Sequence, residues 1–376
     1  MDLKSLYSCE MFSDPEFKPS PTFSVKQGEL LVQGRRNDGK HLFEKTVIEY
    51  ECRWKKQKDW NADRPTIVIP IRNNVGLLKY TSANLRKHDI SEMCNVIIVD
   101  DRSTEDIKQV ALKEGFSYLR VDNTKGFNFS MLNNIAAKIA HFYGSREMIC
   151  WNSDLWCVKK EYFVELLRRH REASAKVSGS KLVYPPRDIS FYSDSMGDNE
   201  NIKKYYQHKR GQWRETVQFG GDFWAIRFPR GVPPTLSPDH YLRFGDISDP
   251  RVNCDRGASF VTAALHVWDL DFFISIGGFN PSLAKNFQDV DICLKVLDNG
   301  EYPMYFGKDI YFHHDESFNF FNNGSEKKEG PQIDSDYVLF GKVWLDSILQ
   351  LAMGFPTKDE VDAQTLAANK LEQGAQ

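Results

Sequence analysis

Carboxylates follow two β-rich runs of the sequence. Asp100 and Asp101 come directly after the apolar run 95–99, and Asp154 follows the run 147–151. Carboxylates at the carboxyl ends of neighbouring parallel strands can hold a divalent cation, accept hydrogen bonds from a ribose, or accept the imide N–H of a pyrimidine base. The alternative is that each aspartate caps the helix that follows it. For Asp154 this alternative is weaker, because residues 155–157 continue with a strand-like pattern.

An aspartate and a histidine pair form a second group. Asp289 opens an amphipathic segment that predicts a helix over 290–299, and the dipole of a helix stabilises a carboxylate at its N-terminus. Such an aspartate is either a cap or a general base. His313 and His314 follow the β-like run 309–312, and adjacent side chains of an extended chain point to opposite sides. We therefore expect at most one of the two histidines to face a given site.

The elements that must position these residues alternate between strand-like and helix-like patterns. The strand-like runs of the first half are 66–71, 95–99, 118–121 and 147–151. The later part of the chain adds a strand-like run at 303–306. Helical spacing of apolar residues predicts helices over 130–143, 270–276, 290–299 and 336–353. This alternation predicts an α/β fold with a mainly parallel sheet flanked by helices.

The regular pattern fails between about 185 and 257, where Gly, Pro, Arg and aromatic residues accumulate. An irregular stretch of this length inside a domain is typical of a lid or a binding loop, and the aromatic content argues against disorder. We expect one domain over 65–325 that contains this region. Residues 1–64 are predicted to be an accessory segment with a hairpin over 23–33, and residues 326–376 to be a helix and a tail.

Composition excludes several classes of function. The 376 residues include 49 Lys and Arg against 52 Asp and Glu, a net charge of −3, which disfavours a broad electrostatic contact with nucleic acid. The seven cysteines contain no C-x-x-C pair that would begin a zinc or redox site. The N-terminus lacks a signal-peptide pattern, and no window reaches the roughly 18 to 20 apolar residues that span a bilayer. We expect a cytoplasmic protein with reduced thiols.

Seven segments within residues 65–320 form an ordered set. They are 66–73 (TIVIPIRN), 96–104 (VIIVDDRST), 126–136 with Asn133 and Asn134, 149–154 (ICWNSD), 277–280 (GGFN), 287–295 (FQDVDICLK) and 311–314 (YFHH). Taken in this order, they resemble the family 2 glycosyltransferases of the GT-A fold. Each segment alone is a weak signal, and their order makes the resemblance specific. It implies a GT-A fold and an enzyme that transfers a hexose-type sugar from a nucleotide sugar.

The resemblance implies a nucleotide-sugar site on the first half of the sheet. Its donor-binding residues would be Pro70, Arg72, Asp100, Asp101, Lys125, Asn133, Asn134 and Asn152. In this arrangement Asp101 accepts from a uracil-type imide and Asp100 lies near the ribose. Pro70 and Arg72 border the base, and Lys125 contacts the diphosphate.

The resemblance also implies a metal site and a catalytic base. Asp154 matches the last carboxylate of the D-x-D signature and would hold Mn²⁺ or Mg²⁺, although the first position is Asn152 here. His313 stands where some relatives add a histidine ligand, with His314 as the alternative. A site with oxygen and nitrogen ligands favours Mn²⁺. Asp289 matches the catalytic base, although the acidic residue that precedes it in the family is Gln288 in this chain.

Acceptor recognition is assigned to the irregular region and its neighbours. The expected acceptor residues are Trp213, Asp222, Trp224, Arg256 and Gln288. Aromatic side chains can stack on sugar faces, and the alternative is that they only pack the region onto the domain. The implied acceptor is a hydroxyl of a glycan or a lipid-linked glycan in surface polysaccharide synthesis. The apolar segment 337–355 is predicted to be buried, with peripheral contact to the inner face of the membrane as the alternative.

One displacement at the anomeric carbon, with Asp289 as the base, would invert its configuration. Two rival functions stand beside this inverting glycosyltransferase. A sugar nucleotidyltransferase usually has a Gly-rich basic loop after the first strand, and Ile71, Arg72 and Asn73 do not provide one. A degenerate carbohydrate-binding partner of a transferase is favoured by Asn152 and Gln288, and the retained acidic residues argue against it.

Overall fold

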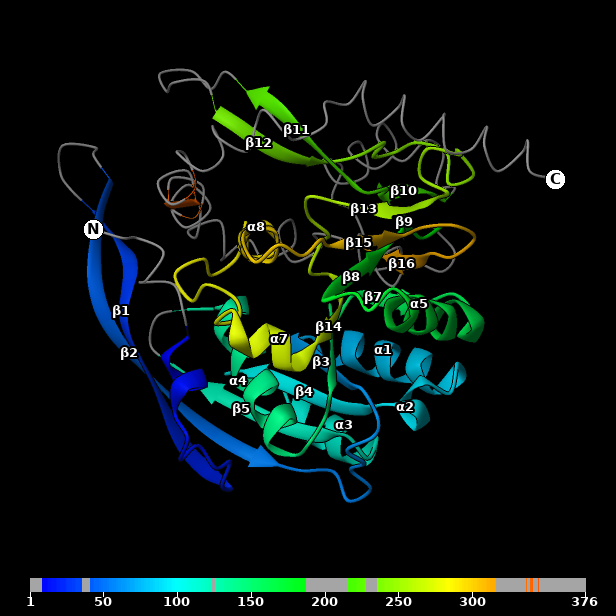
Figure 1. Cartoon of the computed structure of the whole chain (residues 1–376). Helices are drawn as coiled ribbons and strands as arrows, with labels where there is room; N and C mark the ends of the chain where they lie inside the picture. Colours follow the sequence, from blue (N-terminus) through cyan, green and yellow to red (C-terminus); the bar gives the residue numbers. More distant parts are fainter. Residues whose placement is uncertain are drawn as a thin grey trace, which may run out of the picture.

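The computed structural model describes residues 9–35, 41–123, 126–186, 215–227 and 235–315, together with Asp336, Leu339, Phe340 and Trp344. These residues form a mixed α/β structure around a 10-stranded sheet, in the order β1-β2-β5-β4-β3-β6-β14-β8-β15-β13 (Figure 1). A four-stranded sheet, β10-β9-β16-β7, and the β11–β12 hairpin complete the described strands. None of the helices in the described ranges combines the length and apolar character that crossing a membrane requires.

The centre of the large sheet is parallel. It contains β3 (Thr66–Ile71), β4 (Asn95–Asp101), β5 (Ser117–Asp122) and β6 (Glu147–Trp151), with β3 between β4 and β6. Every residue of β3 and β4 is buried. Continuous apolar, β-branched runs of this kind are typical of strands that are covered on both faces. The strand-like patterns predicted these four strands at nearly the observed positions.

The strands that flank this centre pair with it antiparallel. On one side, β2 (His41–Lys55) pairs with β5, and β1 (Thr22–Arg35) pairs with β2. On the other side, β14 (Leu265–Asp269) pairs with both β6 and β8 (Val177–Ser180), and β15 (Met304–Phe306) then pairs with β8 in parallel. The sheet as a whole is therefore mixed, with the predicted parallel pairing at its centre and between β8 and β15.

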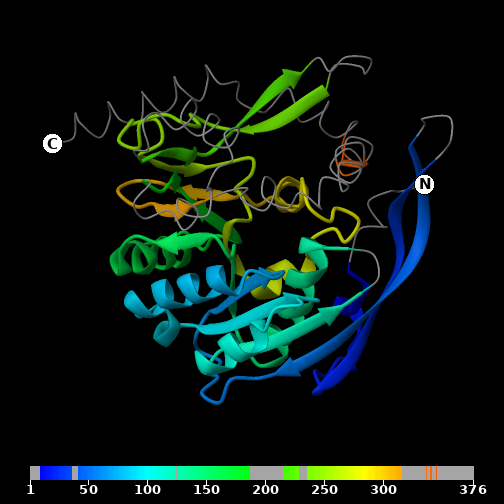
Figure 2. The ribbon, with the colours of Figure 1, turned by 180° about the vertical axis from the view of Figure 1, so that it is seen from behind.

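The predicted hairpin over 23–33 is wrong. β1 runs without a turn from Thr22 to Arg35, and its register with β2 shifts between Gln27 and Leu30. Gly28 lies in this irregularity, where a glycine is accommodated as a bulge. The predicted accessory segment thus contributes two long strands to the main sheet, and they run along one side of the molecule in Figures 1 and 2.

The helices flank the sheet. They are η2 (Glu10–Ser13), α1 (Val75–Lys87), α2 (Ile90–Met93), α3 (Ile107–Lys113), α4 (Phe129–Phe142), α5 (Lys160–Glu172), α7 (Leu270–Ser275) and α8 (Gln288–Asp298). α4 packs on β3, β4 and β6, and nearly all of its residues are buried. Its N-terminus is capped by Asn128, whose side-chain oxygen accepts from the Met131 N–H at 3.0 Å. The patterns predicted α4, α7 and α8 to within two residues at each end.

The region predicted to be irregular contains several strands. They are β9 (Leu182–Tyr184), which ends just before it, and β10 (Thr216–Phe219), β11 (Asp222–Arg227), β12 (Thr235–His240) and β13 (Asp255–Gly257) within it. β12 contains Pro238, a residue that is unusual in a strand, so its pattern is not strand-like. The remaining strands are β7 (Leu155–Cys157), β15 (Met304–Phe306) and β16 (Phe312–His314). The β11–β12 hairpin lies at the end of the molecule opposite β5 (Figures 1 and 2).

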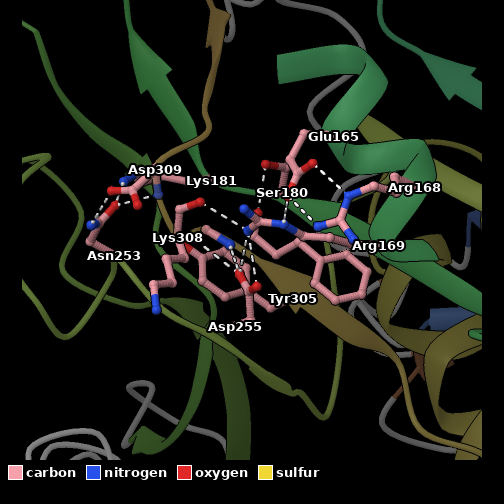
Figure 3. A network of polar contacts seen from close by, with 12 residues as sticks. Glu165, Arg168, Arg169, Ser180, Lys181, Asn253, Asp255, Tyr305, Lys308 and Asp309 are labelled. Carbon is pink, nitrogen blue, oxygen red and sulfur yellow. Dashed lines mark hydrogen bonds and ion pairs between the residues drawn. The ribbon is translucent and has the colours of Figure 1, made fainter. Parts of the chain in front are cut away.

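A polar network joins α5 to β13 and to the segment after β15 (Figure 3). Arg169 donates to Glu165 at 2.7 Å, to both carboxylate oxygens of Asp255 at 2.9 Å, and to the carbonyl of Lys308 at 2.9 Å. Asp255 in turn accepts from the N–H groups of Gly307 and Lys308 at 3.0 Å. A guanidinium carries five N–H donors in one rigid plane, so the Arg169 side chain can bond several acceptors at once. The network therefore holds the edge strand β13 against the rest of the sheet.

A glycine turn after α7 is held by α4. The side chain of Asn134, on α4, donates to the Phe279 carbonyl at 2.8 Å and accepts from the Phe279 N–H at 3.0 Å. Gly278 has φ +63°, and a Cβ built there would lie 2.4 Å from Phe12 Cε2 and 2.7 Å from Asn134 Oδ1. Only glycine fits this position without displacing its neighbours.

We predict that Gly278→Ala lowers the free energy of unfolding by about 2 to 4 kcal/mol, because left-handed strain and steric overlap add together. Gly300→Ala is the matched control, since Gly300 also has a positive φ but would meet no atom within 4 Å. Gly300→Ala should lower the free energy of unfolding, measured in urea, by about 1 kcal/mol. Equal losses for the two variants would contradict the packing argument.

Candidate functional site

Asp100 lies at the end of β4 and is fully engaged within the protein. It is 1% exposed, and it accepts from the Ser103 N–H at 2.8 Å, the Tyr118 hydroxyl at 2.5 Å and Arg120 at 3.3 Å. These bonds close the turn after β4 and tie it to β5. The helix-capping alternative for Asp100 and Asp101 is wrong, because the N-cap of α3 is Asp106.

Asp101, the residue expected to contact the base, lies beneath Arg102. Its carboxylate is fully buried and accepts from Arg102 Nε at 3.0 Å. Burial raises the pKa of Asp101, and the charges of Arg102 and Arg72 oppose this rise. Arg72 is half-buried directly after β3, and Pro70 is buried within that strand. Arg72 and Arg102 therefore place two guanidinium groups around Asp101, and Arg102 must move before a ligand can reach this carboxylate.

Asn133 and Asn134 do not line a site, contrary to expectation. Both side chains are fully buried. Asn133 donates to the Phe129 carbonyl one helical turn earlier at 2.9 Å, and Asn134 holds Phe279 as described above. Their amides connect backbone segments in the interior. Lys125, the expected diphosphate contact, falls outside the described residues.

The structure brings Asp154 together with His314 and not with His313. β16 pairs with β7 so that His314 lies opposite Leu155, and Asp154 Oδ1 is 3.3 Å from His314 Nε2. The side chain of Asn152 reaches the same ring nitrogen at 3.4 Å. His313 points to the other side of the strand, where its Nε2 is 2.6 Å from Glu215 Oε1. The expected pair of Asp154 and His313 is therefore corrected to Asp154 and His314.

The donor atoms around Asp154 suit a divalent cation. Asp154 and His314 offer a carboxylate oxygen and an imidazole nitrogen, and the amide of Asn152 adds an oxygen if its two ends are exchanged. The described ranges contain no group of three or more His, Cys, Asp or Glu side chains that could hold a metal. A cation with one or two protein ligands takes its other ligands from water or from phosphate oxygens. The residues fit a metal that arrives with a phosphorylated ligand.

Asp289 lies in the first turn of α8 and is half-buried. Its carboxylate accepts from the Val290 N–H at 2.9 Å and from the Ala263 N–H at 3.4 Å. The N-cap position is taken by Phe287, so Asp289 is not the cap. Burial raises the pKa of Asp289, and the charge of His240 opposes this rise. A carboxylate with a raised pKa, at a partly exposed position, has the properties of a general base.

A short backbone segment connects the part of the site that contains Asp289 to the part that contains Asp154. The Ala263 N–H donates to Asp289, and the carbonyl of the next residue, Ala264, accepts from the Asn152 N–H at 3.0 Å. Asn152 is two residues from Asp154. Through this segment, the N-terminus of α8 and the end of β6 are held at the same edge of the large sheet.

The described residues of the predicted acceptor set pack the protein instead of presenting a surface. Trp224 is 7% exposed, and its indole N–H donates to Ser259 Oγ at 2.6 Å. Asp222 accepts from the N–H groups of Ser259 and Phe260 at 3.0 and 3.3 Å, and burial raises its pKa. The stacking prediction for Trp224 is therefore wrong in this structure.

Arg256 is half-buried, and its side chain contacts other parts of the protein. The guanidinium of Arg256 lies over the rings of Tyr241 and Tyr305, at 5.5 and 5.0 Å from their centroids. It also donates to the Gly220 carbonyl at 3.0 Å. Gln288 is buried beside Asp289. Trp213, the remaining acceptor residue, falls outside the described residues.

Sequence reasoning missed two residues of this neighbourhood. His240 lies at the end of β12, and its Nδ1 is 3.1 Å from the Gln218 carbonyl and 3.3 Å from the Gln218 side-chain amide nitrogen. Its charge acts on Asp289, as noted above. Asp336 contacts the segment that precedes α8. A lone histidine in a Pro-containing stretch and an aspartate at a helix start gave no distinctive signal.

Comparisons with known proteins give distant similarities. No protein-family model matches the chain. It is 24% identical over 279 residues to the uncharacterised protein y4gI of Sinorhizobium fredii (strain NBRC 101917 / NGR234), a match that covers 73% of this chain. The chain spans only 27% of the length of that relative.

The similar solved structures include two glycosyltransferases. One is GalNAc-T7 with UDP, GalNAc and Mn²⁺, at a TM-score of 0.47 and 13% identity, covering 68% of this chain and 44% of that chain. The other is the mannosyltransferase PcManGT from Pyrobaculum calidifontis in complex with GDP-Man and Mn²⁺, at a TM-score of 0.43 and 12% identity. That match covers 85% of this chain and 83% of that chain.

We predict that Asn134→Ala lowers the free energy of unfolding by about 2 to 4 kcal/mol. The substitution removes two buried hydrogen bonds and leaves the Phe279 N–H and carbonyl without these partners. Urea unfolding of the variant measures the loss. An unchanged stability together with weakened nucleotide binding would instead restore the donor-binding role.

Proposed function

We propose that the chain is a metal-dependent glycosyltransferase. It would move a sugar from a nucleoside-diphosphate sugar, UDP-linked in our proposal, to a hydroxyl of a glycan or lipid-linked glycan. The observation that carries the proposal is the connection through Ala263 and Ala264, which holds the half-buried carboxylate of Asp289 and the Asp154–His314 pair at one sheet edge. The order of the seven motif segments supports the same reaction class.

Asp154 and His314 would hold a divalent cation, Mn²⁺ or Mg²⁺. When bound, that cation supplies Lewis-acid neutralisation of the diphosphate leaving group. Asp289 would accept the proton of the acceptor hydroxyl at a carboxylate oxygen. Because its pKa is raised by burial, the carboxylate is a stronger base than an exposed aspartate. One displacement at the anomeric carbon inverts its configuration, so the proposed enzyme is inverting. Surface polysaccharide synthesis is the destination that we propose for its product.

Substitution of the base tests the assignment. We predict that Asp289→Asn lowers kcat at least 1,000-fold and changes the affinity for UDP less than threefold, because the amide cannot accept the proton. In the wild type, kcat/KM should fall as the pH drops through the raised pKa of Asp289, since protonation removes the base. Quantified product formation over pH 4 to 9 measures both effects. Loss of UDP affinity in a folded Asp289→Asn protein would contradict the role.

The metal pair is tested by nucleotide-dependent stabilisation. We predict that UDP with Mn²⁺ raises the Tm of the wild type, and that Asp154→Ala or His314→Gln removes this rise because each variant loses a cation ligand. His313→Gln is the matched control, because His313 faces Glu215 on the other side of the strand.

If His313→Gln removed the rise in Tm and His314→Gln kept it, His313 would be the metal ligand and our choice of His314 would be wrong. The same panel should include GDP, UDP-glucose and GDP-mannose to identify the donor nucleotide. If none of these ligands shifts the Tm of the wild type, the transferase proposal falls, and a degenerate carbohydrate-binding protein becomes the better reading. Release of pyrophosphate from UTP and a sugar 1-phosphate would instead indicate a nucleotidyltransferase.

A further inference from the structure

Four helical residues near the C-terminus are buried, and three of them contact the segment that carries Asp289. Asp336, Leu339, Phe340 and Trp344 are spaced as one face of a helix, and each is at most 3% exposed. We refer to these four residues as the C-terminal cluster. The burial of Leu339, Phe340 and Trp344 agrees with the burial predicted for the apolar segment 337–355.

Asp336 binds the backbone immediately before α8. Its Oδ2 accepts from the Lys285 N–H and from the Asn286 N–H, both at 3.0 Å. Burial raises the pKa of Asp336 to about 6, and the backbone donors and Lys285 oppose this rise. The carboxylate therefore gathers two consecutive N–H groups of the loop that leads into the helix.

Phe340 supports the next residue along this loop. Its ring stacks on the ring of Phe287, with centroids 4.9 Å apart and planes inclined by 19°. Phe287 has φ +61°, a left-handed conformation that a bulky side chain rarely adopts. Such a conformation persists only where the surroundings hold it in place. Phe340 provides part of that support two residues before Asp289.

Trp344 contacts the chain two residues after Asp289. Its indole N–H donates to Asp291 Oδ1 at 2.9 Å, and Lys295 lies 3.4 Å from Asp291 Oδ2. The cluster thus contacts the chain before Asp289 through Asp336 and Phe340 and after it through Trp344. Asp289 itself accepts only backbone N–H groups among the hydrogen bonds described above. Its position consequently depends on where the backbone of residues 285–291 is held.

We propose that Asp336 and Phe340 are positioning residues for Asp289. This inference rests on the proposed function, because it assigns these two side chains to the placement of the base. The donor-side residues lie on other elements, Asp154 in the loop before β7 and His314 on β16. Loss of the Asp336 hydrogen bonds or of the Phe340 stack should therefore slow the chemical step while it leaves donor binding intact.

The test compares full-length wild type with Asp336→Ala, Asp336→Asn and Phe340→Ala. Leu339→Ala is the matched control, because it removes a buried side chain of the same cluster without removing a hydrogen bond or an aromatic stack. The first measurement is amide hydrogen exchange of peptides that cover residues 284–293, made without any ligand. The second is kcat and donor KM with Mn²⁺ and whichever of UDP-glucose or GDP-mannose the wild type turns over.

We expect Asp336→Ala and Phe340→Ala to speed exchange in 284–293 at least tenfold and to lower kcat at least tenfold, with donor KM within twofold of wild type. Asp336→Asn keeps one acceptor oxygen and should recover part of the lost kcat. Leu339→Ala should change neither exchange in this segment nor kcat by more than about twofold. A Tm measurement of each variant confirms that it is folded, and Asp336→Asn serves if Asp336→Ala does not fold.

Two failures are distinguishable. Unchanged exchange or unchanged kcat in folded variants of an active enzyme would overturn the positioning role and leave the proposed function standing. A wild type that turns over no nucleotide sugar would overturn the function and the catalytic part of this inference with it. Hydrogen exchange would then still decide whether the cluster holds residues 285–291.

Discussion

The antiparallel pairing of β14 with β6 is the constraint on which the site depends. Leu265 lies opposite Trp151 in this ladder, and the next pairing outward joins the Asn152 N–H to the Ala264 carbonyl. A β-ladder fixes the relative position of two strands to within one residue, because a slip reverses every side chain. The ladder thereby joins the parallel half of the sheet, with its strand-end carboxylates, to the segment that contacts Asp289.

The interior polar groups show how the rest of the fold maintains this arrangement. Asn134 holds the glycine turn before α8, and Asp100 closes the turn after β4. Both are buried polar side chains whose hydrogen bonds connect separate segments, and such bonds are costly to lose. Residues with chemistry-bearing side chains therefore divide into two sets. One set stabilises the scaffold, and the other contains the partly buried Asp289 and Asp154, to which we assign the contacts with a ligand.

The sequence predicted the central strands and three of the helices because their apolar spacing is regular. It could not decide between His313 and His314, since the choice depends on the register of β16 with β7 and one residue reverses it. The sequence also could not show whether Asn134 and Trp224 pack the interior or contact a ligand. An amide or an indole side chain is suited to both roles, and only the structure shows their partners. The short strands β10–β13 gave no period to detect.

The position of Asp289 depends on the backbone directly before α8 and on residues near the C-terminus that contact this backbone. Phe287 adopts a left-handed conformation directly before α8, which a bulky side chain rarely adopts. The hydrogen bonds that Lys285 and Asn286 donate to Asp336, and the stack with Phe340, come from about fifty residues later in the chain and support this conformation. A conformation held in this way is specified by tertiary contacts. The direction of the Asp289 carboxylate is therefore a property of the assembled fold and could not be derived from the motif around it.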